Sequence, residues 1–173
     1  MINPFAIFDL PVAFNVDQAI LSERYLVLQK SLHPDNFVTA DAQEQRIAMQ
    51  KSTEVNDALK TLKDPILRAE TIIALNTGKT QDLEQKSTQD MAFLMQQLEW
   101  REELENIEQS QDENALESFV KRVKKETKEM LTALEEQLNE QQWSTAAQFC
   151  DKLRFLKKLA DEISQVEERL FEL

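Results

Sequence analysis

Residues that break helices are scarce in this sequence. Its 173 residues include one glycine, Gly78, and four prolines, all of them within the first 65 positions. The last 95 residues therefore contain neither type. Because glycine and proline are the strongest local interruptions of a helix, this scarcity predicts an all-α protein. The position of the glycine places the main division of the chain near residue 76.

Cysteine and histidine are just as scarce. Cys150 and His33 are the only ones, so an internal disulfide and a site of paired cysteines are excluded. No glycine-rich phosphate loop is present. Glu99, Glu102 and Glu105 resemble part of a di-iron site, but such sites also need Glu-x-x-His pairs. We therefore expect a protein that is not an enzyme, with no catalytic residue, no metal and no cofactor.

Positive charge and long apolar runs are also lacking. The net charge is −12, which argues against nucleic acid or an anionic membrane as partner, because both are recognised through clustered Lys and Arg. No apolar run approaches the roughly 20 residues of a membrane span, and no basic segment follows Met1 as in a signal peptide. These features predict a soluble, cytoplasmic protein. Residues 76–173 hold 22 acidic and 13 basic side chains, a negative field suited to a basic partner.

The first 75 residues predict four helices. Asn3-Pro4 begins a short apolar turn, and Asn15 or Asp17 can cap a second helix. Asp41 can cap a third helix, and Pro65 precedes a fourth helix from Ile66 to about Leu75. The expected buried faces are Leu21, Tyr25, Leu28 and Leu32 in the second helix and Ala48, Ser52, Val55, Leu59 and Leu62 in the third.

The remainder predicts a linker and a three-helix bundle. Residues 76–87 are polar and form the linker, and helices follow over about 88–109, 113–139 and 144–171, with Ser87 or Thr88 capping the first. Their short connections favour antiparallel packing. The middle helix carries a core face of Leu116, Phe119, Val120, Val123, Met130, Leu134 and Leu138. Its basic run is interpreted as a solvated back, with a binding patch as the alternative: Lys121, Arg122, Lys124, Lys125 and Lys128.

His33-Pro34-Asp35 interrupts the helical pattern between the second and third helices. Proline fixes its own φ and moves the preceding residue out of the α region, so the entering helix must end. We expect an exposed loop that presents one imidazole and one carboxylate. With no second catalytic group in the chain, this display indicates a contact surface. Arg24 and Lys30 lie off the buried face of the preceding helix.

The first bundle helix has two apolar faces. At 100° per residue, its expected core face consists of Phe93, Trp100, Leu104 and Ile107. The opposite side carries Met91, Leu94, Met95 and Leu98, and Glu99, Glu102 and Asn106 extend it. Either this second face is covered by the linker or the N-terminal part, or it binds a partner, a use to which methionine is well adapted.

The last helix repeats this feature. Its expected core face is Ala146, Phe149, Cys150, Leu153, Leu156 and Ala160. Phe155 then points away from the core beside Arg154 and is expected to be exposed. Cys150 is interpreted as a small buried hydrophobe, with a reactive thiol as the alternative.

The N-terminal residues resemble the J-domain, with which co-chaperones stimulate ATP hydrolysis by heat-shock-type chaperones. The resemblance rests on His33-Pro34-Asp35 between two amphipathic helices and on Val55-Asn56-Asp57-Ala58-Leu59 through Asp64-Pro65 with Arg68-Ala69-Glu70. Asn36 departs from the lysine that many J-domains have there. The resemblance implies a J-domain over residues 1–75 and a chaperone-binding surface of Arg24, Lys30, His33, Pro34 and Asp35.

The whole chain resembles the HscB-type co-chaperones of iron-sulfur cluster biogenesis, on the residues 92–95, 98–104, 117–125 and 152–156. This implies that residues 88–173 form a scaffold-binding domain. Its partners would be a dedicated HscA-type chaperone and the IscU-type scaffold on which clusters are assembled. The family's scaffold surface matches Leu94, Met95, Leu98, Glu99, Glu102 and Phe155 here, and we add Met91, Asn106 and Arg154. At Asn106 an acidic border residue would be expected.

Two other functions remain open. One is a J-domain adaptor that recruits a different client to a heat-shock-type chaperone. The other is a structural coiled-coil protein, disfavoured because the helices are short and separated by breaks.

Overall fold

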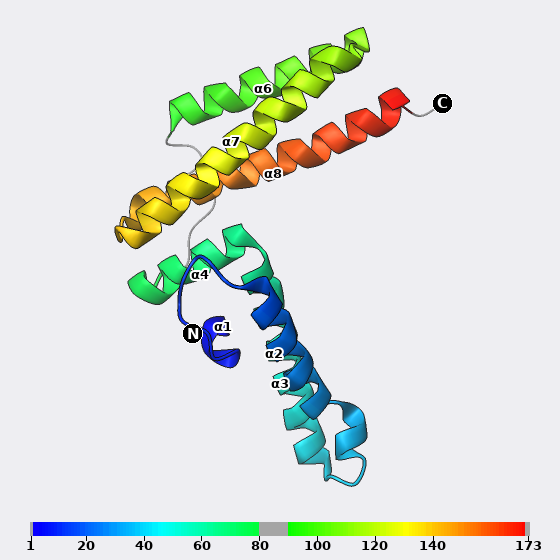
Figure 1. Cartoon of the computed structure of the whole chain (residues 1–173), viewed down its shortest axis with the longest axis vertical. Coiled ribbons are helices and arrows are strands. Elements are labelled where there is room, and N and C mark those ends of the chain that lie inside the picture. The colour runs from blue at the N-terminus through cyan, green and yellow to red at the C-terminus, as the bar shows by residue number, and fades with distance from the viewer. Residues whose placement is uncertain (1, 80–89, 172–173) are drawn as a thin grey trace. The chain divides into compact units, whose positions relative to one another are not determined.

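A computed structural model describes residues 2–79 and 90–171, and every regular element within these ranges is a helix. The all-α prediction is confirmed. The chain divides into two compact units, Met1–Lys79 and Thr80–Leu173, here called the N-terminal and C-terminal units (Figure 1).

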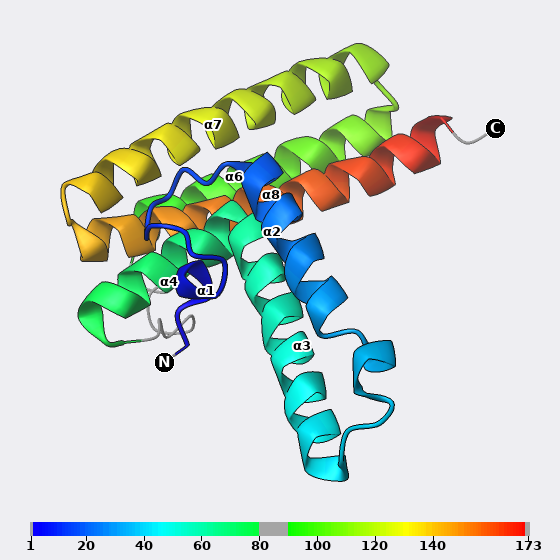
Figure 2. The same ribbon diagram turned by 60° about the horizontal axis from the view of Figure 1, so that its bottom comes forward.

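The N-terminal unit is built around a helical hairpin. Helices α2 and α3 lie side by side, and the short 3₁₀ helix η1 lies at the tip that joins them (Figure 2). The bounds in chain order are α1 (Pro4–Ile7), α2 (Gln18–Ser31), η1 (Pro34–Phe37), α3 (Ala42–Lys63) and α4 (Pro65–Thr77).

Side-chain caps set the helix starts in this unit. The Asp17 carboxylate accepts hydrogen bonds from the Ala19 and Ile20 amides of α2, and the Asp41 carboxylate accepts one from the Glu44 amide of α3. Each cap satisfies amides that have no partner inside the helix. At the other end of the unit, α4 runs to Thr77 and is closed by Gly78 at φ 72°. The predicted linker is therefore wrong at positions 76 and 77, and its residues 80–87 lie outside the described ranges.

The hairpin is joined by polar contacts as well as by apolar packing. Tyr25 Oη and Gln29 Nε2 on α2 both donate to Asn56 Oδ1 on α3, at 2.7 and 2.8 Å. Ser52 Oγ in turn donates to Gln29 Oε1 at 3.1 Å. Ser52 and Tyr25 are half-buried, so their predicted inward faces are correct. Each polar tip is satisfied at the helix interface.

Arg24 ties α1 to the hairpin. Its Nη1 donates to the carbonyl oxygens of Phe8 and Asp9, at 2.8 and 2.6 Å. Phe8 is 1% exposed, and Leu21, one turn before Arg24, is fully buried. The guanidinium thus fixes the carbonyl end of α1 over the core that these side chains form.

Arg68 on α4 is a charged residue inside the N-terminal unit, only 8% exposed. Its Nη1 donates to the Leu62 carbonyl at 2.6 Å, and its guanidinium lies 4.9 Å from the centroid of the Phe14 ring. Burial lowers the pKa of Arg68 from its ordinary value, and the Asp64 carboxylate opposes that change. Arg68 therefore joins three segments: the α3 end, α4 and the loop before α2.

Replacing Arg68 by alanine should destabilise the N-terminal unit by about 2–4 kcal/mol, because it leaves a buried carbonyl without its donor and a void beside Phe14. Both tryptophans, Trp100 and Trp143, belong to the C-terminal unit. In urea, far-UV circular dichroism should gain an earlier transition while the tryptophan fluorescence midpoint stays constant. Arg46→Ala, at an exposed position of α3, is the control, and an unfolding curve matching that control would refute the role of Arg68.

The C-terminal unit is a bundle of α6 (Met91–Ser110), α7 (Glu113–Asn139) and α8 (Trp143–Phe171). The three helices lie alongside one another (Figure 2). Asp90 caps α6 through the Phe93 amide, so the predicted caps Ser87 and Thr88 are wrong. The bounds predicted for α7 are confirmed, and α8 begins one residue earlier than expected.

Most of the expected core of the bundle is buried. In α7, Leu116, Phe119, Val123, Leu134 and Leu138 are buried, with Val120 and Met130 half-buried. Cys150 is fully buried, as expected for a small hydrophobe. Ala160 is exposed, contrary to prediction, and α8 instead buries Leu159, Ile163 and Val166.

Candidate functional site

The His-Pro-Asp turn is an exposed polar feature of the hairpin tip. Helix α2 ends at Ser31, and His33 takes extended angles, φ −59° and ψ 138°, as the following proline requires. The side chains of His33 and Asp35 are 59% and 86% exposed. The expected exposure is confirmed. The expected irregular loop is instead the 3₁₀ helix η1, for which His33 is the N-cap.

The His33 ring is oriented by its own turn. Its Nδ1 accepts a hydrogen bond from the Asp35 backbone amide at 3.2 Å and lies 3.4 Å from Asp35 Oδ2. The first contact needs an Nδ1 without a proton and the second an Nδ1 with one, so the two contacts are alternatives. A ring whose Nδ1 accepts from the Asp35 amide presents an N–H only at Nε2. The turn thus offers a partner one N–H donor and one carboxylate.

The two basic residues expected near this turn differ in surroundings. Lys30 is exposed on the last turn of α2, close in sequence to His33. Arg24 is half-buried and already donates to two carbonyls of the α1 end. Lys30 is therefore the available cation beside the turn, while the Arg24 guanidinium has a structural partner.

Within the bundle, the outer face of α6 faces away from α7 and α8. Met91, Met95 and Leu98 are 68%, 53% and 58% exposed, and Leu94 is half-buried. Phe93, Leu104 and Ile107 on the opposite side are buried. Within the C-terminal unit, the second apolar face therefore lies outside the core formed with α7 and α8. We call Met91, Leu94, Met95 and Leu98 the α6 apolar face.

The carboxylates of α6 fall into two groups. Glu103 pairs with Arg122 of α7, and Glu108 pairs with Arg169 of α8 at 2.8 Å. Glu99, Glu102 and Glu105 are exposed and have no ion-pair partner among residues 2–79 and 90–171. At 100° per residue these three share the side of the α6 apolar face. Asn106 is exposed there too, so the face has an acidic border with a neutral residue at its C-terminal end.

Phe155 corrects the sequence prediction. It is 9% exposed, and its ring packs edge-on against Phe93, with centroids 5.9 Å apart, and beside Trp100 at 6.4 Å. The guanidinium of Arg101 lies 5.7 Å from its centroid. The expected exposure was wrong because α8 packs against both α6 and α7, and Phe155 faces α6. Arg154, beside it, is half-buried and pairs with Asp151 at 3.0 Å.

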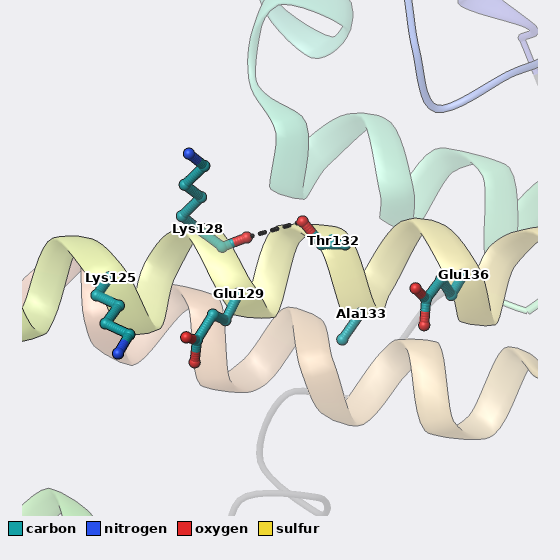
Figure 3. Close-up of a pocket in the computed structure, with 6 residues that line it drawn as sticks. All are labelled: Lys125, Lys128, Glu129, Thr132, Ala133 and Glu136. Atoms are coloured by element: carbon teal, nitrogen blue, oxygen red, sulfur yellow. Dashed lines mark hydrogen bonds between the residues drawn. The ribbon is translucent and has the colours of Figure 1, made fainter.

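The basic run of α7 lacks the character of an anion site. Lys121 pairs with Glu117 at 3.4 Å, and Arg122 pairs with Glu103. Figure 3 shows a hollow further along α7 that is lined by Lys125 and Lys128 together with Glu129 and Glu136. This mixture of signs supports the interpretation of a solvated back.

Within the described ranges, no group of three or more His, Cys, Asp or Glu side chains is placed to hold a metal ion. None of the helices described is both long and apolar enough to cross a membrane.

Comparison with known proteins gives consistent matches. A family model described as the HSCB C-terminal oligomerisation domain matches residues 89–164. A relative from Haemophilus influenzae, named co-chaperone protein HscB homolog, is 69% identical over 100% of this chain and 99% of its own length. The structure of the chaperone HscB from Vibrio cholerae matches with a TM-score of 0.94 and 41% identity, covering 98% of this chain and 100% of that one. Human co-chaperone HscB gives a TM-score of 0.87 at 27% identity, covering 96% and 83%.

The fold and the His-Pro-Asp turn define a J-domain co-chaperone with a C-terminal helical domain. The chain belongs to the HscB family of co-chaperones.

Proposed function

We propose that this chain stimulates ATP hydrolysis by a dedicated HscA-type chaperone and delivers to it an IscU-type scaffold for iron-sulfur cluster maturation. The observation that carries the proposal is the presence of two unlike exposed surfaces on two compact units: the His-Pro-Asp turn and the α6 apolar face. The chain works as a bridge in the cytoplasm and performs no chemistry of its own.

The His-Pro-Asp turn is the chaperone-binding end. His33 offers its Nε2 proton, Asp35 its carboxylate, and Pro34 keeps the two on a stiff turn. Lys30 supplies attraction to an acidic patch. Arg24 contributes by fixing α1 against α2, and a direct contact would require it to leave the Phe8 and Asp9 carbonyls.

The α6 apolar face is the scaffold-binding end, with Glu99 and Glu102 on its border and Asn106 beyond them. Burial of its exposed side chains drives association, and the unpaired carboxylates select a partner with basic groups. Phe155 packs against Phe93 and Trp100 on the buried side of α6, and Arg154 is its neighbour on α8. Both act in this proposal by holding the helix that carries the contact residues.

An assay with all three proteins tests the proposal. The full-length chain should raise the single-turnover ATP hydrolysis rate of an HscA-type chaperone, and scaffold should raise it further, because linked binding increases the effective concentration of the client at the chaperone. Replacing Met95 and Leu98 by alanine should remove only the increment due to scaffold. No stimulation by the intact chain, under conditions where the chaperone hydrolyses ATP, would refute the chaperone-binding end.

A second candidate is a J-domain adaptor for another client. In this candidate the His-Pro-Asp turn binds the chaperone as before, and a client other than the scaffold binds the α6 apolar face. Purified IscU-type scaffold should bind the intact chain in a titration. Stimulation of the chaperone without scaffold binding would favour the second candidate.

A further inference from the structure

The segment that carries the His-Pro-Asp turn has a single large apolar anchor, the half-buried Phe37. No residue of η1 is fully buried. Between His33 and Ala40, only Phe37 and Ala40 are half-buried, and the other residues are exposed. Exposed segments with few buried contacts open with free energies near the low end of the range within a protein. The shape of this turn must therefore depend on hydrogen bonds.

One of these bonds comes from the residue directly after the tripeptide. The Asn36 side-chain amide, Nδ2, donates to the carbonyl oxygens of Lys30 and Ser31, at 2.7 and 3.2 Å. These carbonyls belong to the last turn of α2, where no intrahelical donor is available. Asn36 thereby fastens the start of η1 to the end of α2.

A second amide acts from the opposite side. Gln45 lies on the first turn of α3, and its Nε2 donates to the carbonyl oxygens of Phe37 and Ala40, at 3.0 and 3.3 Å. Phe37 ends η1, and Ala40 directly precedes the Asp41 cap of α3. Gln45 thus fastens the exit of the turn to the second helix of the hairpin.

We propose that Asn36 and Gln45 form an amide clamp that positions His33 and Asp35 for the partner chaperone, an inference that rests on the proposed function. Each of the two primary amides bridges two backbone carbonyls, one pair before and one pair after the tripeptide-bearing turn. Neither amide is needed as a contact with the partner. The clamp raises the fraction of molecules whose turn is ready to bind, and apparent affinity scales with that fraction.

Isosteric acids test the clamp. Asn36→Asp and Gln45→Glu replace the donating nitrogen by a carboxylate oxygen that faces two carbonyl oxygens, so the bonds are lost and replaced by repulsion. At Asn36 the new charge also lies at the negative end of the α2 dipole. Gln43→Glu is the matched control, since Gln43 is exposed on the same first turn of α3 and no hydrogen bond from its side chain is found among the described residues.

The readout is single-turnover ATP hydrolysis by the chaperone over a range of concentrations of the full chain. Each isosteric acid should raise the half-maximal concentration by about 3- to 10-fold, the equivalent of one net hydrogen bond, while the maximal stimulation returns at saturation. Gln43→Glu should match the unchanged chain. Hydrogen exchange of the Asn36 and Ala40 backbone amides, which donate to His33 and Phe37, should accelerate in the two variants without any partner present.

The outcomes separate the clamp from the proposed function. Unchanged exchange and unchanged half-maximal concentration would overturn the clamp, as would faster exchange with no effect on stimulation. A lowered maximum at saturation would also overturn it, because Asn36 or Gln45 would then be a contact residue. If the unchanged chain gives no stimulation, the proposed function fails, and the positioning role fails with it even if hydrogen exchange still shows the amides ordering the turn.

Discussion

His33→Gln should reduce stimulation of the partner chaperone by roughly 30-fold or more, because a central contact residue typically contributes about 2 kcal/mol or more. The imidazole supplies both the Nε2 proton and the acceptor for the Asp35 amide. Glutamine can imitate one of these roles at a time and lacks the flat ring. The measurement is single-turnover ATP hydrolysis with the purified chaperone, at a concentration of the chain below that for half-maximal stimulation by the unchanged protein, where stimulation scales with affinity.

The fold must survive this substitution for the result to be informative. The His33 side chain is 59% exposed, so the midpoint of thermal unfolding should stay within the error of the measurement. Scaffold binding should also be unchanged, because the α6 apolar face belongs to the other unit. Full stimulation by a folded His33→Gln protein would contradict the chaperone-binding role of the turn.

Met95→Ala combined with Leu98→Ala should weaken scaffold binding by about 100-fold, as expected when two apolar side chains that become buried on association are truncated. Isothermal titration of the full chain with purified scaffold would measure the change. Since both side chains are more than half exposed in the free chain, the free energy of unfolding should change little. Stimulation of the chaperone in the absence of scaffold should be retained.

Two further variants distinguish a contact from a packing effect. Phe171→Ala removes an apolar side chain that is 54% exposed at the end of α8, and it should leave scaffold binding unchanged. Phe155→Ala removes a buried ring and should cost about 3–5 kcal/mol of stability. A titration in which Phe171→Ala weakens binding as much as the Met95 and Leu98 pair would contradict the assignment of the α6 apolar face.

Local signals in the sequence predicted the helices well. Asp17 and Asp41 are short acceptors directly before apolar periodic segments, and the structure uses both as N-caps. The start predicted for the helix over 113–139 is likewise correct, and Asp112 is its N-cap. Such features depend on a few neighbouring residues, so they can be recognised without knowledge of the packing.

Contacts between helices were harder to predict. The prediction of an exposed Phe155 treats one helical stripe as the whole core of α8, whereas α8 buries one arc against α7 and another against α6. The partners of Arg24 are backbone carbonyls, which no side-chain pattern reveals. The same holds for the Asn36 and Gln45 amides. The α6 apolar face could be predicted because the periodicity of a single helix is enough to place it opposite the core face of α6.

The burial of Cys150 has a consequence for the proposed delivery of an iron-sulfur scaffold. Thiolates are the preferred ligands of such clusters, and the only thiol of this chain is fully buried in the bundle. Under the proposed function, the α6 apolar face therefore offers a cluster-bearing scaffold no thiolate that could capture iron or exchange with the cluster. In the proposed complex, the chain can bind the scaffold without competing for the iron of the cluster.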